Sequence, residues 1–292
     1  MTAVNTDTAT STTKSQDPPG NTQTVFPYPG GKGDHVDWIL DHLPDHRCYV
    51  EPFAGSAAVL VNKEPSPSEV INDANGDVTT FFRVLRDQPD ALIEWLHRVP
   101  YARSLYEDWA TTWMDGERPN DDIEHAGRFY VLRQMQMMGK LNSVAGLKTG
   151  AKYPASRTFH NARQQLKQFA ERFQEVTIEN RDWHDILDNY DTENSIFYCD
   201  PPYVDQEDTY GIAFNQERFA RAISNIDGKC LISYEDIPAV FDLDEFYVVE
   251  KDTARRMGSQ QRDVTERLLL NFDPKTNETF TDAEQTTLGD LA

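Results

Sequence analysis

Short apolar runs alternate along the chain with segments whose apolar residues recur at helical spacing. Apolar positions at i, i+3, i+4 and i+7 predict a helix over 36–43, and related patterns predict helices over 57–61, 78–85, 91–96, 161–173 and 216–223. Compact apolar runs predict buried strands over 48–50, 69–71, 176–178, 196–198, 230–232, 246–249 and 267–272. Strands that alternate with helices indicate an α/β fold with a mostly parallel, doubly wound sheet.

The interval that begins near residue 98 interrupts this alternation. It is rich in Tyr, Trp, Met and Arg and contains no clear strand–helix unit. We therefore expect a mainly helical domain at 98–174, inserted between two parts of the α/β domain, 25–97 and 175–272. Residues 1–24 are mostly small and polar and residues 273–292 are polar and acidic, so we expect a loose tail at each end.

The charge of the whole chain is strongly negative. It has 28 Lys+Arg against 49 Asp+Glu, a formal net charge of −21. This balance by itself disfavours nucleic acid as a partner, because duplex affinity comes largely from neutralising phosphates. The other interpretation is a surface acidified throughout, as expected of a protein from a halophilic archaeon or its virus, where salt screens the repulsion between carboxylates.

One segment has the opposite charge. Between residues 128 and 172 there are nine Lys or Arg residues, and Glu171 is the only acid. Exposed helix faces usually mix both signs, so this segment is the best candidate for contact with phosphate, although some of these side chains are also explained as ordinary surface charges. The candidate DNA-binding residues are Arg128, Arg133, Lys140, Lys148, Lys152 and Arg157.

The sequence contains few signs of a membrane, disulfide or metal protein. No apolar stretch is long enough to span a bilayer, and no apolar segment follows a basic start at the N-terminus. Cys48, Cys199 and Cys230 form no CxxC pair, and the seven histidines lack metal-ligand spacing. We expect a soluble, cytoplasmic protein that is monomeric and holds no metal.

The tetrapeptide Asp200-Pro201-Pro202-Tyr203 follows the apolar run 196–199 and is expected at the carboxyl end of a strand, where open α/β sheets bind ligands. Prolines cannot donate backbone hydrogen bonds, but their carbonyl groups remain acceptors, and Asp200 adds a carboxylate. These acceptors suit the two N–H groups of an exocyclic amine, and Tyr203 offers a face for a stacked base. The structural alternative is a Pro-Pro turn with an aromatic ring packed nearby.

Two further motifs follow predicted strands. In Glu51-Pro52-Phe53-Ala54-Gly55, the glycine allows a ligand to approach the backbone closely, and the following helix start exposes unpaired N–H groups. The G-x-G-x-x-G pattern of dinucleotide sites is absent. Asp73, after the next strand, can accept hydrogen bonds from two ribose hydroxyls, or it can cap a helix.

Two weaker signals remain. Gly30-Gly31-Lys32 is not a phosphate-binding loop, because the glycine required four residues earlier is missing and Gly33 stands where Ser or Thr is needed. Asp182, after the strand at 176–178, could accept from an adenine amine with Trp183 beside it, or it could be an exposed loop acid.

Taken in order, the motifs resemble those of the Dam-like D12 class of N6-adenine-specific DNA methyltransferases. That family has Gly-Gly-Lys, E-P-F-x-G, N-D-x-N and D-P-P-Y, with a target-recognition insert before the last; this chain has all four, within about residues 25–270. The resemblance implies a Rossmann-like S-adenosylmethionine-dependent methyltransferase fold. The implied cofactor-binding residues are Tyr28, Gly31, Lys32, Glu51, Pro52, Phe53, Gly55, Asp73, Asp182 and Asp200, and the implied catalytic residues are Asp200, Pro201, Pro202 and Tyr203.

The resemblance also implies a reaction. An adenine of double-stranded DNA would be flipped out, Asp200 and the Pro201 carbonyl would hold its N6 amine, and Tyr203 would stack on the base, with S-adenosylmethionine as the methyl donor and no metal. The chain departs from the family at Ala57, where many relatives have Gly, and at Tyr28-Pro29 in place of Trp-Ala; the segment 128–154 matches only loosely and does not indicate a target sequence. The alternatives are methylation of RNA or of a protein amide, and a catalytically silent DNA-binding relative.

Overall fold

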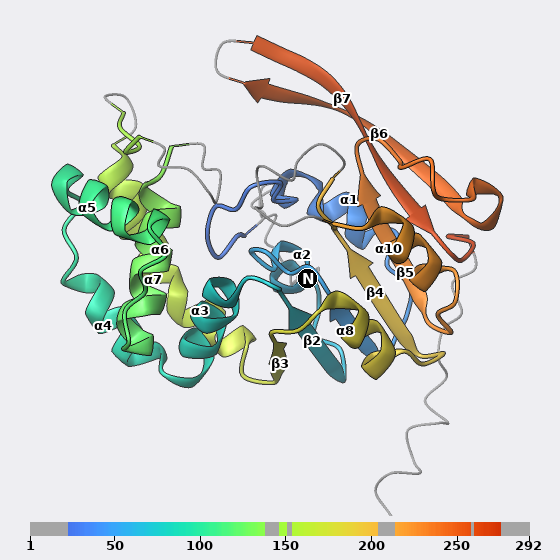
Figure 1. Ribbon diagram of the computed structural model, residues 1–292, viewed down its shortest axis with the longest axis horizontal. Helices are drawn as coiled ribbons and strands as arrows, with labels where there is room; N and C mark the ends of the chain where they lie inside the picture. Colours follow the sequence, from blue (N-terminus) through green and yellow to red (C-terminus); the bar gives the residue numbers. More distant parts are fainter. Residues whose placement is uncertain (1–22, 138–145, 151–153, 204–213, 258–259, 276–292) are drawn as a thin grey trace, which may run out of the picture.

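The computed structural model describes residues 23–137, 146–150, 154–203, 214–257 and 260–275. In it, helices cover both faces of a central sheet, and a group of helices lies to one side of the sheet (Figure 1). The tails expected at 1–24 and 273–292 lie almost wholly outside the described residues.

The central sheet has seven strands in the order β3-β2-β1-β4-β5-β7-β6. The first five are parallel, β7 runs antiparallel to β5, and β6 runs antiparallel to β7. The predicted α/β class with a mostly parallel sheet is therefore confirmed. The strands are β1 (Cys48–Glu51), β2 (Ser68–Asn72), β3 (Val176–Glu179), β4 (Ser195–Cys199), β5 (Lys229–Tyr234), β6 (Tyr247–Met257) and β7 (Gln260–Leu270).

The strand order reverses between β1 and β4, which are paired through Val50 and Phe197. Connections leave such a switch point in opposite directions and open a crevice at the carboxyl ends of the strands. The turns that follow β1, β2 and β4 carry the motifs around Gly55, Asp73 and Asp200. The topology thus gathers at one edge residues that are far apart in the sequence.

Successive strand residues are buried on opposite faces of the sheet, as the two-residue period of a strand requires. Tyr49 and Ile196 share a core with α2 and α3, whereas Val50 and Phe197 share a second core with α8 and α10. The helices and single 3₁₀ turns around the sheet are η1 (Gly33–His35), α1 (Val36–Leu40), α2 (Ala58–Asn62), α3 (Gly76–Asp87), α8 (Trp183–Tyr190), α10 (Gln216–Ile223) and η2 (Leu243–Glu245).

Between β2 and β3, the described residues form four helices beyond α3: α4 (Pro89–His97), α5 (Arg103–Met114), α6 (Asp122–Met135) and α7 (Ala155–Arg172). They are the green group in Figure 1, and α6 packs against α3, where the rings of Phe81 and Tyr130 stack at 5.5 Å. Gly127 on α6 lies directly against the Trp95 ring of α4. The insert therefore shares one continuous apolar core with the α/β domain.

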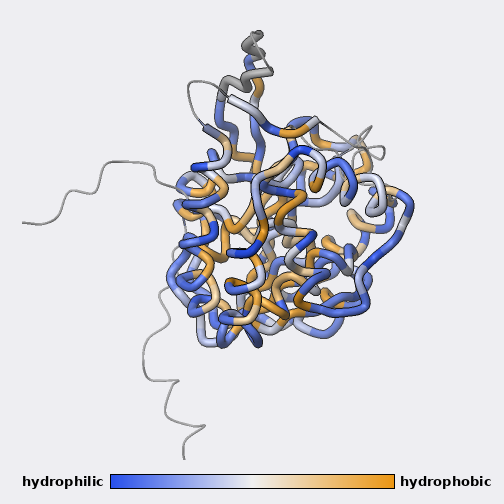
Figure 2. The backbone as a smooth tube through the Cα atoms, turned by 90° about the vertical axis from the view of Figure 1, so that its left-hand side faces the viewer, coloured by the Kyte–Doolittle hydropathy of each residue, from blue (hydrophilic) through white to orange (hydrophobic). Residues whose placement is uncertain are grey.

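The hairpin of β6 and β7 is the largest departure from the predicted elements. Strands were expected only at 246–249 and 267–272, but the two strands pair over eleven positions from Tyr247–Leu270 to Met257–Gln260 and extend beyond the body of the molecule (Figures 1 and 2). The sequence between the apolar ends is polar, and cross-strand contacts such as Arg267–Glu250 at 2.8 Å accompany the pairing.

Two helices also begin or end at other residues than the hydrophobic periodicity predicts. The helix predicted over 36–43 ends at Leu40, and the helix predicted over 161–173 begins earlier, at Ala155, with Pro154 at its N-cap.

Within the described residues, no helix is both long enough and apolar enough to span a membrane. Figure 2 shows the hydrophobic stretches gathered inside the body of the molecule.

Candidate active site

A cavity of about 540 Å³ opens at the carboxyl ends of the strands, next to the switch point. Of the cofactor-binding and catalytic residues predicted from the sequence, Pro201 and Tyr203 are not in its wall. Those that line it are Tyr28, Gly31, Lys32, Glu51, Pro52, Phe53, Gly55, Asp73, Asp182, Asp200 and Pro202. The fold therefore brings four separated motifs to one cavity.

Asp200 directly follows β4 and is held by Lys32. The Lys32 ammonium, whose side chain is 4% exposed, lies 2.9 Å from Oδ1 of Asp200. Burial raises the pKa of Asp200, the Lys32 charge opposes that rise, and the nearby Glu266 adds to it. The result is a carboxyl group with a raised pKa whose ionised form is stabilised mainly by one lysine, with a smaller contribution from the Tyr203 hydroxyl.

The rest of the Asp-Pro-Pro-Tyr turn is fixed around this pair. Lys32 Nζ donates to the Tyr203 hydroxyl and to the Gly30 carbonyl. The Tyr203 ring packs against Tyr234 at 5.7 Å between centroids, so it belongs to the core beside the cavity. Gln216 Nε2 donates to the Pro202 carbonyl at 2.9 Å, and no described residue donates to the Pro201 carbonyl.

Glu51 ends β1 with its carboxylate buried. It accepts hydrogen bonds from the Tyr49 hydroxyl at 2.7 Å and from the Leu60 N–H at 2.8 Å. Burial raises the pKa of Glu51 to about 7, although these two hydrogen bonds act to lower it. Glu51 thus links the end of β1 to helix α2.

The turn after Glu51 brings the backbone close to a ring and a carboxylate. Gly55 has φ of +50°, and a Cβ atom there would lie 2.9 Å from the Tyr28 ring. Its N–H donates to Oδ2 of Asp73 at 2.9 Å. The Tyr28 ring covers Gly55, but the cavity remains open beside both.

Asp73 follows β2 and accepts backbone N–H groups from Gly55 and Asn75. The cap of helix α3 is Asn75, whose side chain accepts from the Asp77 N–H at 3.0 Å. The capping alternative for Asp73 is therefore wrong. Burial raises the pKa of Asp73 to about 6, and no basic side chain among the described residues forms an ion pair with it.

Asp182 is exposed, as the loop-acid interpretation expected, and the structure adds a role that the sequence did not predict. It caps α8 by accepting from the His184 N–H at 2.9 Å, and it also lies in the cavity wall. Partial burial raises its pKa, but the His184 hydrogen bond and the Arg218 guanidinium, 3.1 Å away, outweigh burial and hold the pKa below its ordinary value. The neighbouring Trp183 ring packs 6.4 Å from Phe53.

The basic segment of the insert is only partly a surface feature. Arg163 donates to the Leu96 carbonyl at 2.6 Å, and Arg172 pairs with the buried Glu69. Arg133, expected to touch DNA phosphate, is 7% exposed and lines the cavity instead. A count of charges along a sequence cannot distinguish these interior arginines from surface ones.

The remaining DNA-binding candidates divide into two groups. Arg128 is half-buried, pairs with Glu124 at 2.5 Å and lies over the Trp109 ring, Lys148 is half-buried, and Arg157 is exposed. The other two, Lys140 and Lys152, lie outside the described residues.

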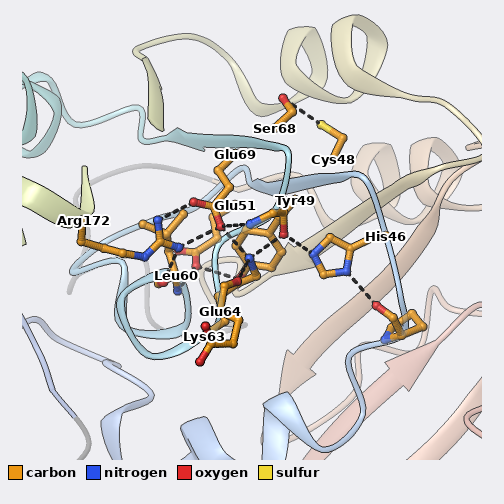
Figure 3. A network of polar contacts seen from close by, with 12 residues as sticks. His46, Cys48, Tyr49, Glu51, Leu60, Lys63, Glu64, Ser68, Glu69 and Arg172 are labelled. Carbon is orange, nitrogen blue, oxygen red and sulfur yellow. Dashed lines mark hydrogen bonds and ion pairs between the residues drawn. The ribbon is translucent and has the colours of Figure 1, made fainter. Parts of the chain in front are cut away.

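A buried ionic network joins the insert to the sheet behind the cavity (Figure 3). Glu69 on β2 accepts from Arg172 at the end of α7 and from Lys63 at 2.6 Å. Arg172 also donates to the Leu60 carbonyl at 2.9 Å, next to the amide that Glu51 binds. This network holds the last insert helix against β2 and α2.

Several residues of the site were missed in the sequence. Trp113, Arg118 and Phe129 come from the insert, and Arg218 comes from α10. No sequence motif marks these residues, because only folding brings them to the cavity.

Glu266 was also missed, although the sequence contains a signal for it. It is 1% exposed on β7, between the inward-facing Val264 and Leu268. An acid at an inward position of an alternating strand could have indicated a buried functional group. His35 Nε2 lies 3.7 Å from its Oε1.

The described part of the chain contains no group of three or more His, Cys, Asp or Glu arranged to hold a metal ion. Its cysteines are free: Cys199 and Cys230 are buried, and Cys48 is half-buried.

Three named proteins are similar in sequence to this chain. The DNA N-6-adenine-methyltransferase of Escherichia phage P1 is 26% identical over 260 residues, which cover 82% of this chain and 34% of the phage protein. The DNA adenine methylase of Escherichia coli is 25% identical over 190 residues, 60% of this chain and 63% of that protein. The Type II methyltransferase M.CviBI of Paramecium bursaria Chlorella virus NC1A is 22% identical over 216 residues, 71% of this chain and 81% of that protein.

The chain thus spans about a third of the phage relative and less than two thirds of the bacterial one. The sequence profile of a single family matches residues 28–252, a stretch that includes all four motifs and the whole insert. On this match, the chain belongs to the family of D12 class N6 adenine-specific DNA methyltransferases.

Proposed function

We propose that this protein transfers a methyl group from S-adenosylmethionine to the N6 amine of an adenine in double-stranded DNA. The observation that carries the proposal is the half-buried Asp200 carboxylate, 2.9 Å from the buried Lys32 ammonium, in the wall of a cavity at the carboxyl edge of the sheet. Membership of the D12 class and the names of the relatives support adenine as the target.

The cavity fits this cofactor. Asp73 is a half-buried carboxylate whose described hydrogen bonds come from the backbone, one to each oxygen. Each carboxylate oxygen can accept a second hydrogen bond, so Asp73 suits a ribose with two hydroxyl groups. Trp183 and Phe53 provide apolar surface for an adenine ring, and Asp182 lies beside them. When bound, S-adenosylmethionine supplies an electrophilic methyl group on a sulfonium, so the protein needs mainly to orient the acceptor.

Asp200 is the residue that we assign to the acceptor amine. A flipped adenine, extruded at a cost of a few kcal/mol, would present two N6–H donors to the Asp200 carboxylate and the Pro201 carbonyl. S-adenosylmethionine would supply the methyl group to N6 and leave as the thioether, and Asp200, whose pKa is raised by burial, would accept the N6 proton that is lost. Tyr203 keeps Lys32 in place through its hydroxyl, and we retain it as a candidate for stacking on the base.

The DNA would reach the site across the insert. We propose that Arg128, Lys148 and Arg157 contact phosphates there, together with Lys140 and Lys152. These contacts would oppose the repulsion from a net charge of −21, so binding should weaken steeply as salt rises.

The test compares the unaltered protein with Asp200→Ala. Each is incubated with S-adenosylmethionine carrying a labelled methyl group and with plasmid duplex, total RNA or protein as acceptor, at low and at molar salt. The DNA is then digested to nucleosides and examined for N6-methyladenine. Asp185→Ala is a matched control, because Asp185 is an exposed acid on α8 outside the cavity wall.

We expect label in DNA adenine from the unaltered protein and from Asp185→Ala, and a loss of at least about 100-fold in Asp200→Ala with its folding intact. Near-normal methylation by Asp200→Ala would refute the role of this carboxylate. Label in RNA or protein but not in DNA would refute the proposed substrate.

A further inference from the structure

Arg133 is a buried cation in the wall of the cavity. It lies near the end of α6, its residue is 7% exposed, and it lines the cavity with Phe129 and Trp113. Its guanidinium carbon is 5.9 Å from the centre of the Phe129 ring. The sequence pattern predicted contact with DNA phosphate at the surface, but this side chain is buried in the wall of the cavity.

The described residues leave Arg133 without a hydrogen-bond or ion-pair partner. Its Nε is buried and unpaired, as are the Nε atoms of Arg128, Arg163 and Arg172. Those three arginines differ because each uses its other nitrogens, on Glu124, the Leu96 carbonyl and Glu69 respectively. Among these four arginines with a buried Nε, only Arg133 uses none of its guanidinium nitrogens in a described hydrogen bond or ion pair.

Every other cation of the cavity wall faces an acid. Lys32 pairs with Asp200 at 2.9 Å, and Arg218 pairs with Asp182 at 3.1 Å. Arg118 places Nε 2.8 Å from Oδ1 of Asp77, and both Asp77 oxygens are occupied by Arg118. Each of these cations therefore already has an acidic partner within the protein.

An unpaired guanidinium in such a place carries a large cost in free energy. Burial lowers the pKa of Arg133, although Tyr28, Tyr106 and Asp77 act in the opposite direction from outside ion-pair distance. Arginine nevertheless remains charged in proteins. A buried charge is ordinarily paired, and the missing partner here must be an anion that enters the cavity.

We propose that Arg133 binds the carboxylate of the methionine part of S-adenosylmethionine. This inference rests on the proposed function, since it takes that cofactor as the occupant. At neutral pH the cofactor has two positive groups, the sulfonium and the ammonium, and a single negative one. A guanidinium fork suits a carboxylate, which it can bind through two parallel hydrogen bonds.

The position of Arg133 agrees with this end of the cofactor. The phenol of Tyr28 influences the pKa of Arg133, and the Tyr28 ring covers Gly55 beside the cavity. Asp73 and Asp182 lie at other parts of the wall and suit the ribose and the adenine. A phosphate of duplex DNA is the less suitable partner, because Arg133 is 93% shielded from solvent on an inner wall.

One consequence concerns the insert. Arg133 belongs to α6, which leads directly into the segment that contains Lys140 and Lys148. Cofactor affinity would therefore depend on a helix of the proposed DNA-binding domain, and the insert would be part of the cofactor site.

The experiment uses two ligands that differ only in this carboxylate. S-adenosylhomocysteine carries it, and S-adenosyl-3-thiopropylamine is the same molecule without it. Isothermal titration calorimetry gives the Kd of both ligands for the full-length unaltered protein, Arg133→Gln, Arg133→Lys and Arg103→Gln. Arg103 is the matched control, an exposed arginine on α5 paired with Glu107. Thermal unfolding of each variant verifies its fold.

We expect Arg133→Gln to bind S-adenosylhomocysteine about 10- to 100-fold more weakly, with Arg133→Lys between it and the unaltered protein. All four proteins should bind the decarboxylated ligand with similar Kd, and Arg103→Gln should match the unaltered protein with both. If Arg133→Gln fails to fold, the unaltered protein alone still tests the inference, because it should prefer S-adenosylhomocysteine at least tenfold.

Equal affinity of the unaltered protein for the two ligands would overturn the inference while leaving the proposed function intact. So would an unchanged S-adenosylhomocysteine Kd in Arg133→Gln together with weakened duplex binding, which would assign Arg133 to DNA phosphate. Failure of the unaltered protein to bind S-adenosylhomocysteine would overturn the proposed function as well.

Discussion

Replacing Lys32 by Met should slow methyl transfer and shift its pH dependence. The buried Lys32 and the half-buried Asp200 form an ion pair at 2.9 Å, and the Lys32 charge is the largest influence that lowers the pKa of Asp200. Methionine keeps most of the side-chain volume and removes the charge. The pKa of Asp200 then rises further, so less of the carboxylate is ionised at neutral pH.

The size of the effect follows from the geometry. Unit charges 2.9 Å apart attract by about 6 kcal/mol at an effective dielectric constant near 20. The net loss of stability is smaller, about 3 kcal/mol, because Lys32→Met also removes the cost of burying an ammonium group. A carboxylate hydrogen bond to the amine is worth about 1.5–3 kcal/mol, so the rate at pH 7 should fall about 10- to 100-fold.

The assay measures kcat for methyl transfer to duplex DNA from pH 6 to 9.5 at saturating cofactor, with urea unfolding in parallel. The rise of kcat with pH should lie at higher pH in Lys32→Met than in the unaltered protein, since the pKa of Asp200 is higher. Lys63→Met is the control: it loses a more deeply buried pair, to Glu69 at 2.6 Å, and should lose at least as much stability without moving the kcat profile. A Lys32→Met profile that coincides with that of the unaltered protein would refute the reasoning.

Three further predictions concern stability. Because burial raises the folded-state pKa of Glu51 from 4.5 to about 7, the folded protein binds an extra proton between these values, and its unfolding free energy should fall as pH rises through that window. Glu51→Gln should flatten this decline by about 3 kcal/mol between pH 4.5 and 8 in urea titrations; parallel curves would argue against a buried neutral carboxyl group. Gly127→Ala puts a Cβ atom 2.4 Å from the Trp95 ring and should cost about 1–3 kcal/mol, seen as a lower Tm; an unchanged Tm would mean that α4 and α6 separate freely. Arg172→Met should lower the urea midpoint by the equivalent of about 3 kcal/mol, whereas Arg98→Met, at an exposed pair, should leave it nearly unchanged; equal midpoints for the two variants would contradict the buried network.

Much of the fold could be read from local pattern. A run such as 196–198 predicts a buried strand wherever it lies, and β4 and α10 occur where the pattern predicts them, because burial of alternating or helical faces is a local requirement. The hairpin of β6 and β7 could not be read in this way. Its polar residues form strands because each strand supplies the other with backbone partners, which is a property of the pair.

The same distinction between local pattern and tertiary structure applies to the site. The sequence alone determined which chemical groups follow which strands: a carboxylate and prolines after β4, an acid after β2 and a glycine turn after β1. Only the tertiary structure decided that Lys32 neutralises Asp200 from 168 positions away, and that Arg133 lies in the wall of the cavity rather than on the surface. The reason is physical. Chain connectivity determines where a strand ends, but the ionisation and the partners of a charged group depend on desolvation and on charges within a few ångströms, and these are set by residues that only folding brings near.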